Sequence, residues 1–244
     1  MGTGLVFSLL LFSTAAHAQT PPRSGLEFAG PELRALQQDD GANPGMLWVD
    51  RGAALWRQDC ARCHGEPASM RGVAARYPAL DSKSGKPLNL EGRINQCRVE
   101  RMKASALAYE SEGLLSLTAI VAHQSRGMPI TVEANDESKK HIASGRAEYY
   151  RRRGQMNLAC ANCHEQNWGK RLGAETLSQG HPNGYPAYRL EWQSLGSTHR
   201  RLRSCFYGLR AELPPFGSDE LTRLELFLAW RARGLPLESP AVRR

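Results

Sequence analysis

The chain has 244 residues, with 32 Lys and Arg against 24 Asp and Glu, a formal net charge of +8 at pH 7, and 41% hydrophobic residues. No apolar tract is long enough to cross a bilayer, which excludes an integral membrane protein. Ordinary hydrophobicity with 23% charged residues excludes a largely disordered chain. The length suits two domains of roughly 110 residues better than one large domain.

The N-terminal residues have the pattern of a signal peptide. Residues 5–16 are mostly apolar and lead into the small-residue pattern Ala16-His17-Ala18, although residues 1–4 contain no Lys or Arg. A Pro-containing polar stretch follows at once, which argues against a buried hydrophobic helix. We therefore expect residues 1–18 to be cleaved and the mature protein to be exported to the periplasm.

Four of the six cysteines lie in two C-x-x-C-H motifs, at residues 60–64 and 160–164. This is the attachment signature of c-type haem, because two thiols one helical turn apart reach the two vinyl groups while the adjacent imidazole points at the iron. A four-cysteine zinc site would not explain a His at the same offset in both copies. We predict two covalently bound haem c groups. Their predicted residues are Cys60, Cys63 and His64 for the first and Cys160, Cys163 and His164 for the second.

The two motifs lie within a longer internal repeat. A G-x-A-x-aromatic pattern precedes each motif, at residues 52–56 and 145–149, and Arg-Gly-(Met or Leu)-Pro ends each copy, at residues 126–129 and 233–236. Helix, haem motif, long loop and helix is the plan of a class I cytochrome c, in which the glycine lets the first and last helices cross closely.

The repeat predicts an all-α fold of two tandem class I cytochrome c-like domains related by internal duplication. We expect an N-terminal domain at residues 19–135 that holds the first haem and a C-terminal domain at residues 136–244 that holds the second. The Gly- and Pro-rich stretches at residues 82–88 and 180–186 are expected to wrap around haem as loops rather than to form sheet.

The other two cysteines, Cys97 and Cys205, also recur in both copies, whereas no further His or Met does. Each has basic neighbours, which favour a thiolate, and a thiolate offsets the charge of ferric iron. We expect both to be the second axial ligands of the haem irons. A disulfide between them is the alternative. Anionic ligation favours low reduction potentials, which suit an ordinary electron carrier poorly.

Longer stretches resemble the SoxA family, the dihaem subunits of the periplasmic SoxAX complex of sulfur-oxidising bacteria. The resemblance covers residues 89–98, 153–159 and, most specifically, Tyr185-Pro186-Ala187-Tyr188-Arg189-Leu190-Glu191-Trp192, followed by residues 196–201. It implies an L-cysteine S-thiosulfotransferase that oxidatively joins thiosulfate to a cysteine of the SoxYZ carrier and passes two electrons to cytochrome c.

The resemblance also implies roles for particular residues and partners. Cys205 would be the catalytic residue, carrying a persulfide as well as ligating the second haem, and Arg201 would bind substrate. A monohaem SoxX-type cytochrome would complete a heterodimer.

Four arginines close to Cys205 provide enough guanidinium to hold the thiosulfate dianion, although a solvated basic face or a haem-propionate clamp would explain some of them equally well. They are Arg200, Arg201, Arg203 and Arg210. No basic-aromatic motif indicates a nucleic-acid partner. Two other functions remain open: a thiosulfate dehydrogenase that couples two thiosulfates to tetrathionate, and a dihaem electron carrier without enzymatic activity.

Overall fold

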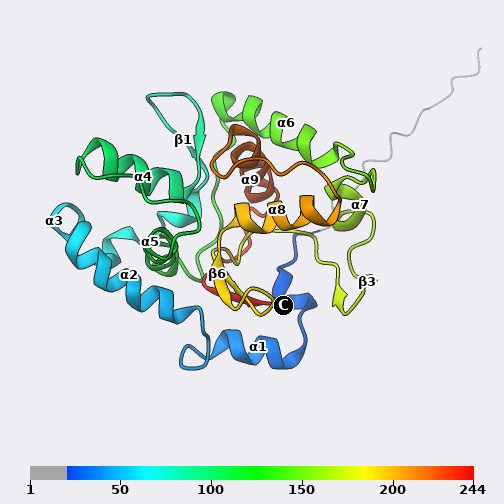
Figure 1. The fold of residues 1–244 in the computed structure, drawn as a ribbon, viewed down its shortest axis with the longest axis horizontal. Helices are drawn as coiled ribbons and strands as arrows, with labels where there is room; N and C mark the ends of the chain where they lie inside the picture. The colour runs from blue at the N-terminus through cyan, green and yellow to red at the C-terminus, as the bar shows by residue number, and fades with distance from the viewer. Residues whose placement is uncertain (1–20) are drawn as a thin grey trace, which may run out of the picture.

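The structure is a computed structural model that describes residues 21–244, so the expected signal peptide lies outside the described residues. Helices dominate it, and Figure 1 shows α2, α3 and α4 on the left of the molecule and α6, α7 and α8 toward the right. The helices are α1 (Pro31–Gln38), α2 (Met46–Asp59), α3 (Ala61–His64), α4 (Leu90–Glu100), α5 (Glu112–His123), α6 (Asp136–Tyr150), α7 (Cys160–His164), α8 (Thr198–Gly208) and α9 (Asp219–Arg231). No helix among the described residues is both long and apolar enough to cross a membrane.

The first and last long helices of each repeat copy pack together at a glycine. A Cβ on Gly52 of α2 would lie 2.2 Å from the carbonyl oxygen of Ser116 in α5. A Cβ on Gly145 of α6 would lie 2.0 Å from the carbonyl oxygen of Arg223 in α9. Any side chain larger than hydrogen would push these helices apart, so the close crossing predicted at both glycines is confirmed.

The repeated Arg-Gly-(Met or Leu)-Pro stretches contact each other. Pro129 and Pro236 form an antiparallel bridge. On one side the N–H of Gly127 donates to Leu237 O at 2.8 Å, and on the other the N–H of Gly234 donates to Ile130 O at 3.0 Å. The two halves are therefore joined through equivalent segments, and a single apolar core runs from Val49 to Val242 across both of them.

The N-terminal segment crosses to the other half of the molecule. Asn43 donates from Nδ2 to Pro240 O at 2.9 Å, and Gln37 Oε1 accepts from the N–H of Val242 at 3.1 Å. Helix α1 accordingly packs beside β7 at the C-terminus, as Figure 1 shows. Residues before α2 thus tie the second half in place.

Three small sheets were not expected from the sequence, so the all-α prediction holds only for the main architecture. In the first half β1 (Ala79–Leu80) pairs with β2 (Pro87–Leu88), which lies in a stretch expected to be loop. The second half contains β3 (Arg171–Leu172) paired with β4 (Glu175–Thr176), and β5 (Ala187–Arg189) between β6 (Ser194–Gly196) and β7 (Ala241–Arg243). Strands of two or three residues are too short for an alternating pattern to reveal.

Candidate functional site

The two C-x-x-C-H motifs form single helical turns, as the spacing predicted. Helix α7 carries Cys160, Cys163 and His164, and α3 carries Cys63 and His64 with Cys60 as its N-terminal cap. Thiols three residues apart on one turn point to the same side. Each motif therefore presents two thiols and an imidazole together.

The orientation of the second imidazole is fixed by its surroundings. His164 donates from Nδ1 to the carbonyl oxygen of Ser178 at 2.8 Å, because a carbonyl can only accept. Gly180, at a φ of +74°, lies against the ring, and a Cβ there would come within 2.8 Å of its Cγ. The proton is thus held on Nδ1, and Nε2 presents its lone pair to a ligand or metal.

Helix α8 places Cys205 opposite this imidazole. Ser197 caps the helix by accepting from the N–H of Arg200 at 3.1 Å. Burial alone would raise the pKa of the Cys205 thiol, but the positive charge of Arg201 and a hydrogen bond with His164 lower it to about 7. Burial and then the charge of Cys205 raise the pKa of Cys163 and that of Cys160, the latter to about 12. All these groups therefore belong to one site.

Arg201 lies one turn before Cys205 on the same face of α8. Its pKa is raised chiefly by the charge of Cys205, against the opposing effect of burial. The guanidinium and the thiol thus lie close together, as their spacing of one helical turn predicted.

The other three arginines of the predicted cluster have different contacts. Arg200 stacks on Trp192 at 4.3 Å from the ring centroid, and Arg203 donates to Leu213 O at 3.3 Å while stacking on Phe216. Arg210 donates to Gln155 Oε1 at 3.3 Å in an exposed position. None of the three is among the main charges acting on Cys205.

A different arginine, which was not singled out from the sequence, acts on the pKa of Cys205 in their place. Arg189 on β5 is only 5% exposed, and its charge also lowers the pKa of Cys205. It lies in the stretch that carried the strongest family resemblance, which was the available signal. Its sequence distance from Cys205 concealed its role, because the three-stranded sheet brings β5 to α8.

A surface groove of about 480 Å³ opens beside Arg201. Aromatic and cationic side chains from α8 and from the loops on either side of it form its walls. It is lined by Glu191, Trp192, Arg200, Arg201, Arg203, Ser204, Tyr207, Leu213 and Phe216. Tyr207 is 76% exposed at its edge, so the groove offers an apolar and basic surface beside Arg201.

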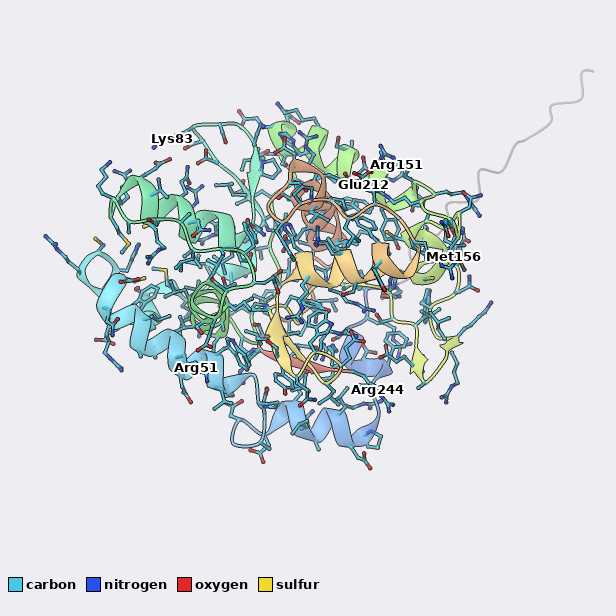
Figure 2. All side chains as sticks on the ribbon, viewed as in Figure 1. Arg51, Lys83, Arg151, Met156, Glu212 and Arg244 are labelled. Atoms are coloured by element: carbon cyan, nitrogen blue, oxygen red, sulfur yellow. The ribbon has the colours of Figure 1, made fainter. Side chains whose placement is uncertain are left out.

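Met156, labelled in Figure 2, lies in the loop that joins α6 to α7. Its N–H donates to Leu209 O at the C-terminal end of α8, at 3.3 Å. This bond ties the loop before the second motif to the helix that carries Cys205.

Cys97 lies near Cys60 of the first motif. Burial, the charge of Asp59 and then that of Cys97 raise the pKa of Cys60 to about 11. Arg98 forms an ion pair with Asp59 and so links α4 to the end of α2. Each spare cysteine therefore lies beside its own motif, and all six cysteines are free thiols, which excludes a Cys97–Cys205 disulfide in this structure.

Known proteins match this chain closely. The family model "SoxA/TsdA, cytochrome c domain" matches residues 50–130. L-cysteine S-thiosulfotransferase subunit SoxA of Pseudaminobacter salicylatoxidans is 43% identical over 91% of this chain and 80% of its own, and that of Rhodovulum sulfidophilum is 38% identical over 91% and 80%. The chain belongs to the SoxA family.

A solved structure agrees with this assignment. The crystal structure of SoxXA from P. pantotrophus superimposes with a TM-score of 0.88 at 36% identity, covering 91% of this chain and 87% of that one. The family model covers SoxA and TsdA together and alone would not separate them. The relatives named above are SoxA subunits and carry the enzyme name that the resemblance implied.

Membership of a cytochrome c family implies that this SoxA-family chain binds haem c. The residues at the second motif fit that group. Two thiols share one turn, and the imidazole of His164 faces the thiol of Cys205, whose pKa is lowered. One imidazole and one thiol are thus the groups available as ligands at this motif.

Proposed function

We propose that this chain is the SoxA subunit of a periplasmic L-cysteine S-thiosulfotransferase that joins thiosulfate to a cysteine of the SoxYZ carrier. The observation that carries the proposal is the pairing of Arg201 and Cys205 on one face of α8, with Cys205 opposite His164. A guanidinium beside a reactive sulfur suits a substrate that has an anionic sulfonate end and a sulfur end.

Two haem c groups would be held by the two residue sets. Cys60 and Cys63 would attach the first, and Cys160 and Cys163 the second, with one His and one Cys on each iron. The axial pairs would be His64 with Cys97 and His164 with Cys205. When bound, the second haem supplies an electron acceptor next to the reacting sulfur.

The reaction balances as one carrier thiol and one thiosulfate dianion giving a carrier S–S–sulfonate, one proton and two electrons. One sulfur–sulfur bond forms and the carrier S–H bond breaks. Arg201 binds the sulfonate oxygens and so directs the outer sulfur of thiosulfate toward the sulfur on Cys205, the residue proposed to carry a persulfide. The two electrons leave to a cytochrome c.

The test is Arg201→Ala in the dihaem protein assembled with its partner. We expect kcat/KM for thiosulfate and carrier to fall on the order of 10²-fold, about 2.7 kcal/mol, because one charge-assisted contact is lost. The electron paramagnetic resonance signal of the thiolate-ligated second haem should be unchanged. Turnover at the wild-type rate would show that Arg201 does not bind substrate.

Product analysis separates this function from the nearest alternative. Wild-type protein supplied with thiosulfate and carrier should yield the carrier S-thiosulfonate, measured by intact mass. Tetrathionate formed from thiosulfate alone, with the carrier unmodified, would contradict the proposal and favour a thiosulfate dehydrogenase.

We also propose a SoxX-type monohaem cytochrome as partner, supported by the likeness to a SoxXA structure. A catalytic haem of low potential needs an electron acceptor nearby. Purification from native periplasm should yield a heterodimer. An isolated monomer with full transferase activity would contradict this.

The domain assignment is part of the same proposal: a cleaved signal peptide at residues 1–18, then duplicated cytochrome c domains at residues 19–135 and 136–244. Support comes from the matched glycine crossings at Gly52 and Gly145 and from the pairing of residues 126–129 with residues 233–236.

A further inference from the structure

The groove beside Arg201 contains a single acidic residue among its lining side chains, Glu191, in the turn between β5 and β6. Its Oε1 accepts a hydrogen bond from Arg189 Nε at 2.8 Å. The same oxygen forms an ion pair with Nη1 of Arg201 at 3.9 Å. One carboxylate oxygen thus faces both of the guanidinium groups that act on the site of Cys205.

The segment that carries Glu191 is held firmly. The ring of Trp192 packs against two guanidinium groups, that of Arg189 at 5.2 Å and that of Arg200 at 4.3 Å from the ring centroid. Gly196 leaves the room for this stack, since a Cβ there would lie 2.4 Å from Trp192 Cζ3. Arg189 itself is buried on a paired strand, so it is a fixed anchor for Glu191.

The position of this carboxylate has two consequences for Arg201. It restrains the guanidinium from the side of the groove, and it places a negative charge next to the position where an anion would bind. An oxyanion whose only contact is with Arg201 is repelled by the carboxylate of Glu191 and gains no other contact that offsets the repulsion. Thiosulfate has an additional contact to make, through its outer sulfur, with the sulfur on Cys205.

We infer that Glu191 is a positioning and specificity residue of the thiosulfate site: it orients Arg201 and weakens the binding of oxyanions that lack a sulfur end. This inference rests on the proposed function and assigns a role to part of the stretch of residues 185–192. Glu191 acts through Arg201 and does not itself react.

The test compares Glu191→Gln with wild type in the dihaem complex, at constant ionic strength. Sulfate binding, measured by calorimetry and as competitive inhibition of turnover, should become about 3-fold tighter in the variant, because one repelling charge is removed. The kcat for thiosulfate should fall while KM does not rise, because the anion still binds but Arg201 is no longer restrained.

Two further variants separate a specific role from a general one. Glu191→Asp retains the charge and should keep the weak sulfate binding of wild type. Glu137→Gln, at an exposed position of α6 far along the chain, makes the same change in net charge and should leave sulfate binding and kcat unaltered. The resonance signal of the second haem should be the same in all variants, which shows that Cys205 remains its ligand.

Unchanged sulfate binding in Glu191→Gln would overturn the inference, as would an equal effect in Glu137→Gln. A failure of the proposed function is distinguishable, because wild-type protein would then not modify the carrier, whereas the calorimetric comparison between variants needs no turnover.

Discussion

The two spare cysteines differ in what surrounds them, although the sequence places both among basic residues. Cys205 has the guanidinium of Arg201 one turn away, and the charge of the buried Arg189 also acts on it. Beside Cys97, the neighbouring Arg98 is paired with Asp59. The second site therefore has two guanidinium groups that lower the pKa of its sulfur, which agrees with the catalytic role proposed for Cys205.

This difference predicts the outcome of Cys97→Met. The protein should fold and retain two haems, but the ligation of the first haem alone should change, because Met replaces a thiolate. Electron paramagnetic resonance combined with turnover measurements checks this. Complete loss of activity with an unaltered second-haem signal would contradict the assignment of Cys97 to a non-catalytic site.

At the scale of elements, each helix pair depends on a glycine at its crossing point. Glycine normally weakens a helix, by roughly 0.5–1 kcal/mol relative to Ala, so its presence within α2 and α6 needs a reason. The reason is backbone contact, since in both cases the nearest atom to an added Cβ is a carbonyl oxygen of the partner helix. Such an atom cannot rotate aside as a side chain can.

Gly145→Ala should therefore lower the free energy of unfolding by about 1–3 kcal/mol through overpacking, despite its better helix propensity. The matched control is Gly113→Ala in α5, where an added Cβ would meet only the flexible side chain of Leu107 at 3.7 Å. That variant should be unchanged or slightly stabilised. Urea unfolding followed by circular dichroism measures both, and equal stability of the two variants would contradict the role of the crossing.

At the scale of the whole molecule, buried ionisable groups lie between the two halves. Glu91 of α4 is 5% exposed and Glu225 of α9 is 8% exposed, and both line a cavity of about 50 Å³. Burial, followed by the charge of Glu225, raises the pKa of Glu91 to about 8. His199 lies with Nε2 at 3.1 Å from Glu225 Oε2 and accepts at Nδ1 from the N–H of Gly217.

The raised pKa predicts a dependence of stability on pH. Folded protein keeps a proton on Glu91 up to about pH 8, whereas the unfolded chain releases it near the ordinary value of 4.5. The stabilising contribution of Glu91 to the free energy of unfolding is therefore fully present below pH 4.5 and is lost as pH rises to about 8. Glu91→Gln, which is neutral at every pH, should flatten this decline. Urea unfolding across that range tests it, with Glu137→Gln as a control that should keep the wild-type slope.

The sequence alone was sufficient for the local geometry of the motif helices and of the helix crossings. Both C-x-x-C-H turns, the close approach at Gly52 and Gly145, and the placement of Arg201 one turn before Cys205 were predicted correctly. Each depends on helical periodicity over a few residues, or on a glycine where two helices cross too closely for any side chain.

The tertiary structure decided which charges act on which sulfur. The four arginines near Cys205 in sequence are separated by the helix, so three of them point to other partners, while Arg189 is brought in by the pairing of β5 with β6 and β7. Tertiary packing also decided three other features. They are the contacts of Glu191, the buried pair of Glu91 and Glu225, and the joining of the two Arg-Gly-(Met or Leu)-Pro stretches. Electrostatic effects depend on distance in space, and residues far apart in a chain come within a few ångströms only when the strands and helices that carry them pack together.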